Sequence, residues 1–183
     1  EQQAVAGMLQ VDDAEASAGE RRYALPPAYA AVLVHEDHPA HAAPLALMMA
    51  GIGAILPRVL EAYRTGDPVP YEHYGQDFRD GQAGINRPGF LYDLPERWLP
   101  ALADVHARLQ RSQPTRVADV GFGAGWAAIG MARAFPNADV VGFDLDEASV
   151  AVARREAAAR GVAPRFECRD VLDITAEGPF DRI

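Results

Sequence analysis

The chain contains no lysine, and all 17 of its basic residues are arginines. Its 26 acidic residues outnumber them and give a formal net charge of −9 at pH 7. A nucleic-acid surface needs clustered Lys and Arg to neutralise phosphates, so this balance excludes such a surface over the whole chain. We therefore expect no nucleic-acid partner. The absence of lysine, beside many alanines, indicates a bias of genome composition.

Cysteine is almost absent as well, and Cys168 is the single example. One thiol excludes an internal disulfide and a cysteine-based zinc site. The first residues also lack the basic segment and following apolar segment of a secretory signal. The sequence therefore predicts a cytoplasmic protein.

Long apolar runs are scarce too, and the longest is residues 42–57, AAPLALMMAGIGAILP. It falls short of the roughly 20 apolar residues that a membrane span needs, and it contains two glycines and Pro57. We expect a buried helix that breaks near Pro57, then a second helix that ends at Gly66. No membrane partner is predicted.

The first 41 residues suggest small elements joined by polar segments. Residues 5–11 and 21–26 flank an acidic tract and predict a β-hairpin with a long tip. A short helix is expected over 27–34. Three histidines follow in the segment 35–41, but their spacing suits neither a helix nor a strand. We interpret that segment as a polar loop and predict no metal site.

Residues 67–95 show no clear periodicity and are rich in aromatic and polar side chains. Such a tract is typically functional or disordered, and its aromatic content favours order. His73 and Tyr74 either lie near a substrate or simply pack. Arg87 either clamps a carboxylate or holds the loop in shape. Residues 96–111 carry apolar side chains at helical spacing, and Pro100 should divide or kink that helix.

After residue 112 the pattern changes to an alternation of strands and helices. Strands are expected at 116–120, 138–146 and 165–170, helices at 126–135 and 147–161, and the start of a fourth strand at 180–183. Strands that alternate with helices predict an α/β fold with a parallel sheet and crossover helices.

A glycine-rich loop, GFGAG at 121–125, joins the first of these strands to its helix. Such loops let a nucleotide-like cofactor approach the backbone closely. Asp119, Asp144 and Asp170 lie at the ends of three successive strands. A carboxylate beside the loop would repel a pyrophosphate but attract a cationic ligand. An acid at a strand end is often only a turn residue, but three in phase with the loop favour adenosine carrying a positive charge.

These segments, VADVGFGAG, VVGFDLD, FECRDVLD and GPFDRI, in this order, resemble the class I S-adenosylmethionine-dependent methyltransferases. The resemblance implies a Rossmann-like sheet, of which residues 116–183 would be the first half. It implies S-adenosylmethionine as cofactor and the following cofactor-binding residues: Asp119, Gly121, Phe122, Gly123, Gly125, Asp144, Leu145, Asp170 and Val171. Phe122 departs from the small residue common at its position and is expected to narrow the pocket. The family places its acceptor site and any general base largely in later segments, so the catalytic residues stay unknown.

The N-terminal part resembles, less sharply, a subfamily that sets a winged-helix domain before the catalytic domain. The resemblance implies three regions: a winged-helix remnant over 1–40, a helical connecting region over 41–112, and half of the cofactor domain over 113–183. The chain begins without Met and stops where a strand starts, so we expect a piece truncated at both ends.

Three functions compete. The first is a methyltransferase that acts on a small-molecule acceptor by in-line displacement. The second is a winged-helix transcriptional regulator whose methyltransferase-like domain senses a ligand. Residues 1–34 hold five acids and two bases, whereas a DNA-contacting wing should be basic. That part would therefore serve dimerisation or shape the cleft, with a homodimer as the candidate assembly. The third, an NAD-dependent oxidoreductase, is disfavoured by Asp119 and Asp170.

Overall fold

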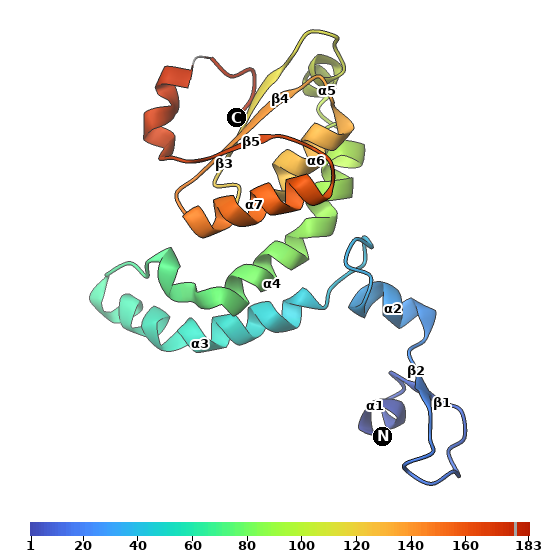
Figure 1. The fold of residues 1–183 in the computed structure, drawn as a ribbon. Coiled ribbons are helices and arrows are strands. Elements are labelled where there is room, and N and C mark those ends of the chain that lie inside the picture. Colours follow the sequence, from blue (N-terminus) through green and yellow to red (C-terminus); the bar gives the residue numbers. More distant parts are fainter. Residues whose placement is uncertain (178) are drawn as a thin grey trace. The chain divides into compact units, whose positions relative to one another are not determined.

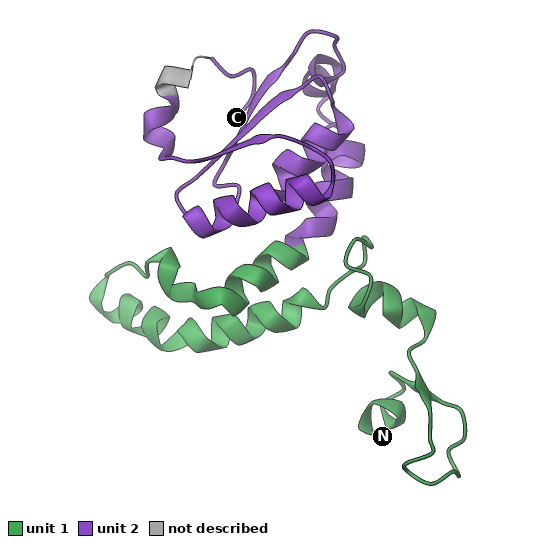
Figure 2. Cartoon of the chain, in the orientation of Figure 1, with its two compact units in different colours: residues 1–85 green, residues 86–183 purple. Residues whose placement is uncertain are grey.

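The structure is a computed structural model and describes residues 1–177 and 179–183. Gly178, the first residue of the expected GPFDRI element, lies outside the described residues. The chain divides into two compact units, residues 1–85 and 86–183 (Figure 2). The boundary falls inside helix α4, Gly75–Pro88.

Unit 1 begins with small elements. Helix α1 spans Gln2–Val5, strand β1 spans Gln10–Val11 and strand β2 spans Tyr23–Ala24. The two strands pair antiparallel, so the predicted hairpin forms, but with only two residues in each strand. Helix α2, Pro27–Leu33, begins with a proline at its first position, where no backbone N–H is needed.

Helix α3, Pro44–Thr65, runs through Pro57 without a break, so the predicted division into two helices is wrong. Proline removes the N–H that would bond the carbonyl of Gly53, and Gly53 is exposed, so water can satisfy that carbonyl. The helix ends at Gly66, as predicted, with a left-handed φ of 81°.

The expected burial of this helix is also wrong. Only 11% of its most apolar window is buried, and leucines such as Leu56 and Leu60 are exposed. Length and composition alone would let α3 cross a membrane, with a mean hydropathy of 1.6 over 18 residues. A single helix of this kind is weak evidence of a span, because core helices pass the same test.

The tract predicted as irregular is largely helical. A short 3₁₀ helix, η1 at Tyr71–Tyr74, leads into α4, and a π-helical segment, η2 at Gly89–Trp98, follows directly. Gly81 and Gly84 of α4 are packing positions, each facing a residue of α3. A Cβ at Gly81 would overlap the backbone of Met48 on α3, and one at Gly51 of α3 would come within 2.5 Å of the Phe78 backbone nitrogen.

Unit 2 continues with α5, Ala103–Leu109, which is separated from η2 by a turn at Pro100, as predicted. The sheet consists of β3, Arg116–Val120, β4, Asp139–Asp144, and β5, Arg165–Cys168. All three are parallel in the order β3-β4-β5. Helix α6, Trp126–Ala134, and helix α7, Glu147–Ala159, cross between them (Figure 1). The predicted α/β fold is confirmed.

Apolar side chains cover both faces of this sheet, as parallel sheets require. Val117 and Val140 point to the face packed by α6 and α7, in the cluster that contains Ile129 and Val150. Ala118, Val141 and Phe143 point to the opposite face of the sheet. They form a second cluster there with Ile174 and Phe180, which come from the chain after β5. Ile174 belongs to the last helical segment, η3 at Val171–Glu177.

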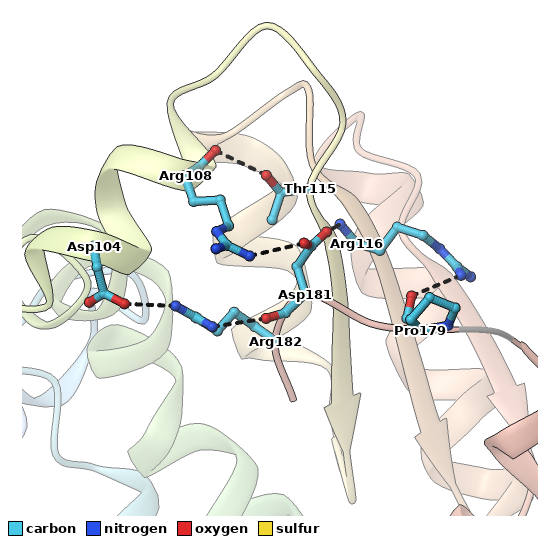
Figure 3. Close-up of polar contacts among 7 residues, drawn as sticks. All are labelled: Asp104, Arg108, Thr115, Arg116, Pro179, Asp181 and Arg182. Atoms are coloured by element: carbon cyan, nitrogen blue, oxygen red, sulfur yellow. Dashed lines mark hydrogen bonds and ion pairs between the residues drawn. The ribbon is translucent and has the colours of Figure 1, made fainter.

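Residues 181–182 lie beside β3, on the edge away from β4. Val117 forms a parallel bridge with Arg182, and the Asp181 backbone N–H donates to the Arg116 carbonyl at 2.9 Å. The Asp181 carboxylate accepts from the Arg116 backbone N–H at 3.0 Å and from the Arg108 guanidinium at 3.2 Å (Figure 3). These bonds place β3 inside the sheet, with a neighbour on each side.

Candidate cofactor site

The carboxyl ends of parallel strands meet at one edge of a sheet, and ligands of open α/β sheets bind there. Asp119, Asp144 and Asp170 all lie at this edge, on or directly after β3, β4 and β5. The structure therefore brings together the three acids that the sequence indicated. The glycine loop, defined as residues 121–125, leads from β3 into α6 at the same edge.

The glycine loop needs its glycines for their conformation. Gly121, Gly123 and Gly125 have left-handed φ values of 68°, 56° and 78°. A Cβ built on Gly121 or Gly123 would meet nothing within 4 Å, so the space beside both is open. A side chain there would strain the backbone and fill the space that a ligand could use.

Asp119 lies beneath the loop. Its carboxylate accepts from the backbone N–H of Ala128, in the first turn of α6, at 3.1 Å. Burial raises the pKa of Asp119 to about 6, and the nearby charge of Asp144 adds to the rise, while the Ala128 hydrogen bond opposes it. A partly buried carboxylate with a raised pKa beside an open loop is typical of a functional position.

Asp144 ends β4 and is bonded to the loop itself. One carboxylate oxygen accepts from the Gly123 backbone N–H at 2.8 Å, and the other accepts from the Asp146 backbone N–H at 2.9 Å. Asp146 in turn caps α7 by accepting from the Ser149 N–H at 3.0 Å. Each carboxylate oxygen has two lone pairs, so Asp144 can accept further bonds from a ligand.

Asp170 follows β5 and accepts from the Leu172 backbone N–H at 2.9 Å. Leu145 and Val171, two of the predicted cofactor-binding residues, are 71% and 43% exposed. Exposed apolar side chains beside hydrogen-bonding acids suit the flat, half-polar surface of a nucleobase. Cys168, the single thiol, is exposed at the end of β5.

The glycines and acids of this edge fit a cationic adenosine cofactor. The open space beside the loop is what close approach of such a cofactor requires. A dinucleotide would put its pyrophosphate against the partly buried Asp119, and the two negative charges would repel.

The remaining predicted site residues are His73, Tyr74, Arg87 and Phe122. His73 is exposed in η1 of unit 1, and Tyr74 packs its ring 4.7 Å from that of Phe78. In unit 2, the Arg87 guanidinium lies 5.0 Å from the ring centroid of Trp126, the first residue of α6. Phe122 is buried, with its ring 4.8 Å from that of Phe166.

Gly142, in the middle of β4, was not predicted as a site residue, yet a Cβ there would come within 2.6 Å of the Phe122 ring. A glycine inside an apolar strand signals a close approach, and that signal was available.

Comparison with known sequences shows that a family described as a methyltransferase domain matches residues 117–183. That segment is a class I methyltransferase domain. S-adenosylmethionine is the cofactor of this class, as the resemblance predicted.

Two curated relatives are themselves named as methyltransferases. A demethylmenaquinone methyltransferase of Thermus thermophilus is 35% identical over 99 residues, which make up 50% of this chain and 45% of that protein. A release factor glutamine methyltransferase of Deinococcus radiodurans is 35% identical over 122 residues, 66% of this chain and 43% of that protein. The chain thus spans less than half the length of the curated relatives it matches.

Solved structures share the fold across both units. An O-methyltransferase family protein from Burkholderia thailandensis has a TM-score of 0.60 at 15% identity, covering 96% of this chain and 50% of that one. PigF, solved with SAH, has a TM-score of 0.55 at 17% identity, covering 91% and 48%. At these identities the likeness concerns the fold alone.

Proposed function

We propose that the protein transfers the methyl group of S-adenosylmethionine to a small-molecule acceptor by in-line displacement. One observation carries the proposal: three carboxylates at the ends of successive parallel strands lie at the same sheet edge as an open glycine loop in a methyltransferase domain. The activity of the matched relatives supports it.

Each residue of the edge has a proposed role. Asp144 accepts hydrogen bonds from the two ribose hydroxyls, and Asp170, Leu145 and Val171 surround the adenine. Asp119 attracts the ammonium of the methionyl group, directly or through water. Gly121, Gly123 and Gly125 allow the backbone to approach the cofactor. We also assign Phe122, which lies between two of these glycines, to the cofactor-binding residues.

The cofactor supplies an activated methyl on a sulfonium, which is its own leaving group. The residues of the chain then have to bind it, orient it and exclude water. None of the residues named here has to move a proton, so no catalytic residue is assigned. His73, Tyr74 and Arg87 remain proposed acceptor contacts, on the grounds of their chemistry: two aromatic donors and a cation that could hold a carboxylate.

We further propose that the hairpin and short helices of unit 1 belong to a winged helix that serves assembly. The acidic balance of residues 1–34 argues against a DNA contact. The exposed apolar residues of α3 support a homodimer, because apolar surface of this extent favours association. Cytoplasmic location belongs to the same proposal.

Calorimetric titration of the full-length protein with S-adenosylhomocysteine and with NAD tests the cofactor. We expect binding of the first and none of the second. NAD binding without a response to S-adenosylhomocysteine would refute the proposal. Turnover with a panel of oxygen and nitrogen acceptors then separates an enzyme from a ligand-sensing regulator, which would bind the cofactor without transferring its methyl group.

Asp144→Ala tests the ribose contact. Hydrogen bonds to a charged group contribute about 1.5–3 kcal/mol each, so we expect the Kd for S-adenosylhomocysteine to rise at least about tenfold. Asp139→Ala is the matched control, because Asp139 pairs with Arg116 at the opposite end of the same strand. An unchanged Kd in Asp144→Ala would show that another residue holds the ribose.

A further inference from the structure

Phe122 lies in the middle of the glycine loop, yet its side chain is only 8% exposed. It belongs to the main core cluster, with residues of α6, α7 and the sheet. Its two neighbours, Gly121 and Gly123, both have left-handed φ values. The backbone therefore turns on each side of Phe122, so that the ring points into the domain while both glycines stay open to a ligand.

The Phe122 ring packs against one aromatic ring, and the absence of a side chain at a glycine leaves the space that it occupies. It lies 4.8 Å from the Phe166 ring of β5, with the two planes inclined at 52°. Gly142 of β4 makes the room, because a Cβ there would come within 2.6 Å of the Phe122 ring and 2.8 Å of the Phe166 ring. The two rings thus lie against β4, directly behind the loop.

The same aromatic pair also limits the far end of the loop. A Cβ at Gly125 would come within 2.9 Å of the Phe166 ring and 2.7 Å of the Ala153 Cβ. The Gly125 N–H donates to the carbonyl of Phe122 at 2.9 Å and closes the turn. Phe122 therefore fixes the middle of the loop through its ring and the end of the loop through its carbonyl.

The rest of the loop is bonded to the strand ends. The Gly121 N–H donates to the Phe143 carbonyl at 2.8 Å, and the Gly123 N–H donates to the Asp144 carboxylate at 2.8 Å. A loop held at every second residue enters a complex already ordered. Ordering it beforehand removes part of the entropy cost of binding.

We propose that Phe122 is a positioning residue for the cofactor, acting through the buried ring that anchors the glycine loop. The inference rests on the proposed function, because cofactor binding is the property that the anchor serves. It differs from the expectation that Phe122 narrows the pocket, since the ring lies in the core. The ring need not touch the cofactor; loosening it alters the loop backbone that does.

The test compares Phe122→Leu with Phe135→Leu in the full-length protein. Phe135 is also buried in the main core cluster, 6% exposed, but it follows the other end of α6 and packs against His106. Both substitutions remove ring volume from the same core, so both should lower the melting temperature. Only Phe122→Leu should raise the Kd for S-adenosylhomocysteine, by about tenfold, and the KM for S-adenosylmethionine, with kcat little changed.

Phe166→Leu is a second variant that loosens the same pair without altering the loop sequence, and it should raise the Kd in the same direction. It keeps the test open if Phe122→Leu does not fold. If Phe122→Leu and Phe166→Leu, where they fold, had the same Kd as Phe135→Leu, the inference would be overturned and the proposed function would still stand. Failure of the wild-type protein to bind S-adenosylhomocysteine would overturn both.

Discussion

Glycines serve different structural purposes in the two units. In the glycine loop of unit 2, Gly121 and Gly123 have left-handed φ values and open space where a Cβ would stand. In the helix pair of unit 1, Gly51 and Gly81 are helical, and a Cβ on either would overlap the facing helix. The first pair is needed for its backbone conformation and for access. The second pair is needed for packing.

The largest effect is expected from Gly81→Ala, which would break the packing side of this comparison. The Cβ would overlap the Met48 backbone, and backbone cannot move aside as a flexible side chain can. Overpacking costs about 1–3 kcal/mol and occasionally more. Because the obstacle here is backbone, we expect a cost at the upper end of this range, above the roughly 1 kcal/mol that alanine gains over glycine in a helix. We expect a lower free energy of unfolding by chemical denaturation.

Gly53→Ala is its control, on α3 and with nothing within 4 Å of the new Cβ. It should stabilise by up to about 1 kcal/mol through helix propensity alone. If both variants shifted stability in the same direction, contact between α3 and α4 would not be the reason for the glycine at 81.

The same contrast explains what the sequence could predict. Residues 116–168 were predicted well, because short apolar strands, a glycine loop and amphipathic helices each carry a local signal. The helix at 75–88 was missed, because Gly81 and Gly84 look like loop residues until their partners on α3 are known. The helix break predicted at Pro57 was wrong for a related reason. The Gly53 carbonyl that loses its partner in the helix is exposed, so water can bond it and the helix continues.

Within the site, the acids could be placed from strand ends, but the direction of the Phe122 ring could not. The sequence is compatible with a Phe122 side chain that points to solvent or into the core. The space beside Gly142 is what lets the ring point into the core. The pKa of Asp119 likewise depends on burial under α6, which a strand-end position alone does not imply.

An intermediate effect is expected from Gly123→Ala, which tests the loop side of the comparison. Alanine at φ 56° costs about 1–2 kcal/mol of conformational strain without any clash. Its Cβ would also enter the open space, so the Kd for S-adenosylhomocysteine should rise at least about tenfold. Calorimetry and thermal melting measure the two effects separately.

Gly161→Ala is the matched control for Gly123→Ala. Gly161 has a left-handed φ of 68°, a Cβ there would meet nothing within 4 Å, and the residue follows α7, away from the glycine loop. The strain should be alike and the Kd unchanged. A tenfold weaker Kd in both variants would mean that lost stability, not blocked access, reduces binding.

The smallest effect near neutral pH is expected from the charge of Asp119, which decides what ligand the open loop accepts. Its folded-state pKa of about 6 lies above the ordinary value of 3.8, because burial disfavours the charged form. A cationic ligand prefers the ionised carboxylate, so binding should tighten as pH rises through 6 and level off above it. For a ligand that binds only that form, the Kd at pH 6 should be about twice that at pH 7.5.

Asp119→Asn keeps an acceptor for the Ala128 N–H but cannot ionise, so its Kd should be weaker and constant over this range. Stability supplies an independent check of sign. Ionisation of wild-type Asp119 destabilises the fold, a cost absent below pH 3.8 and complete above 6. The asparagine variant should therefore gain stability relative to wild type as pH rises from 4 to 7. A wild-type Kd that stayed flat from pH 5.5 to 7.5, together with no relative gain, would show that Asp119 is ionised throughout.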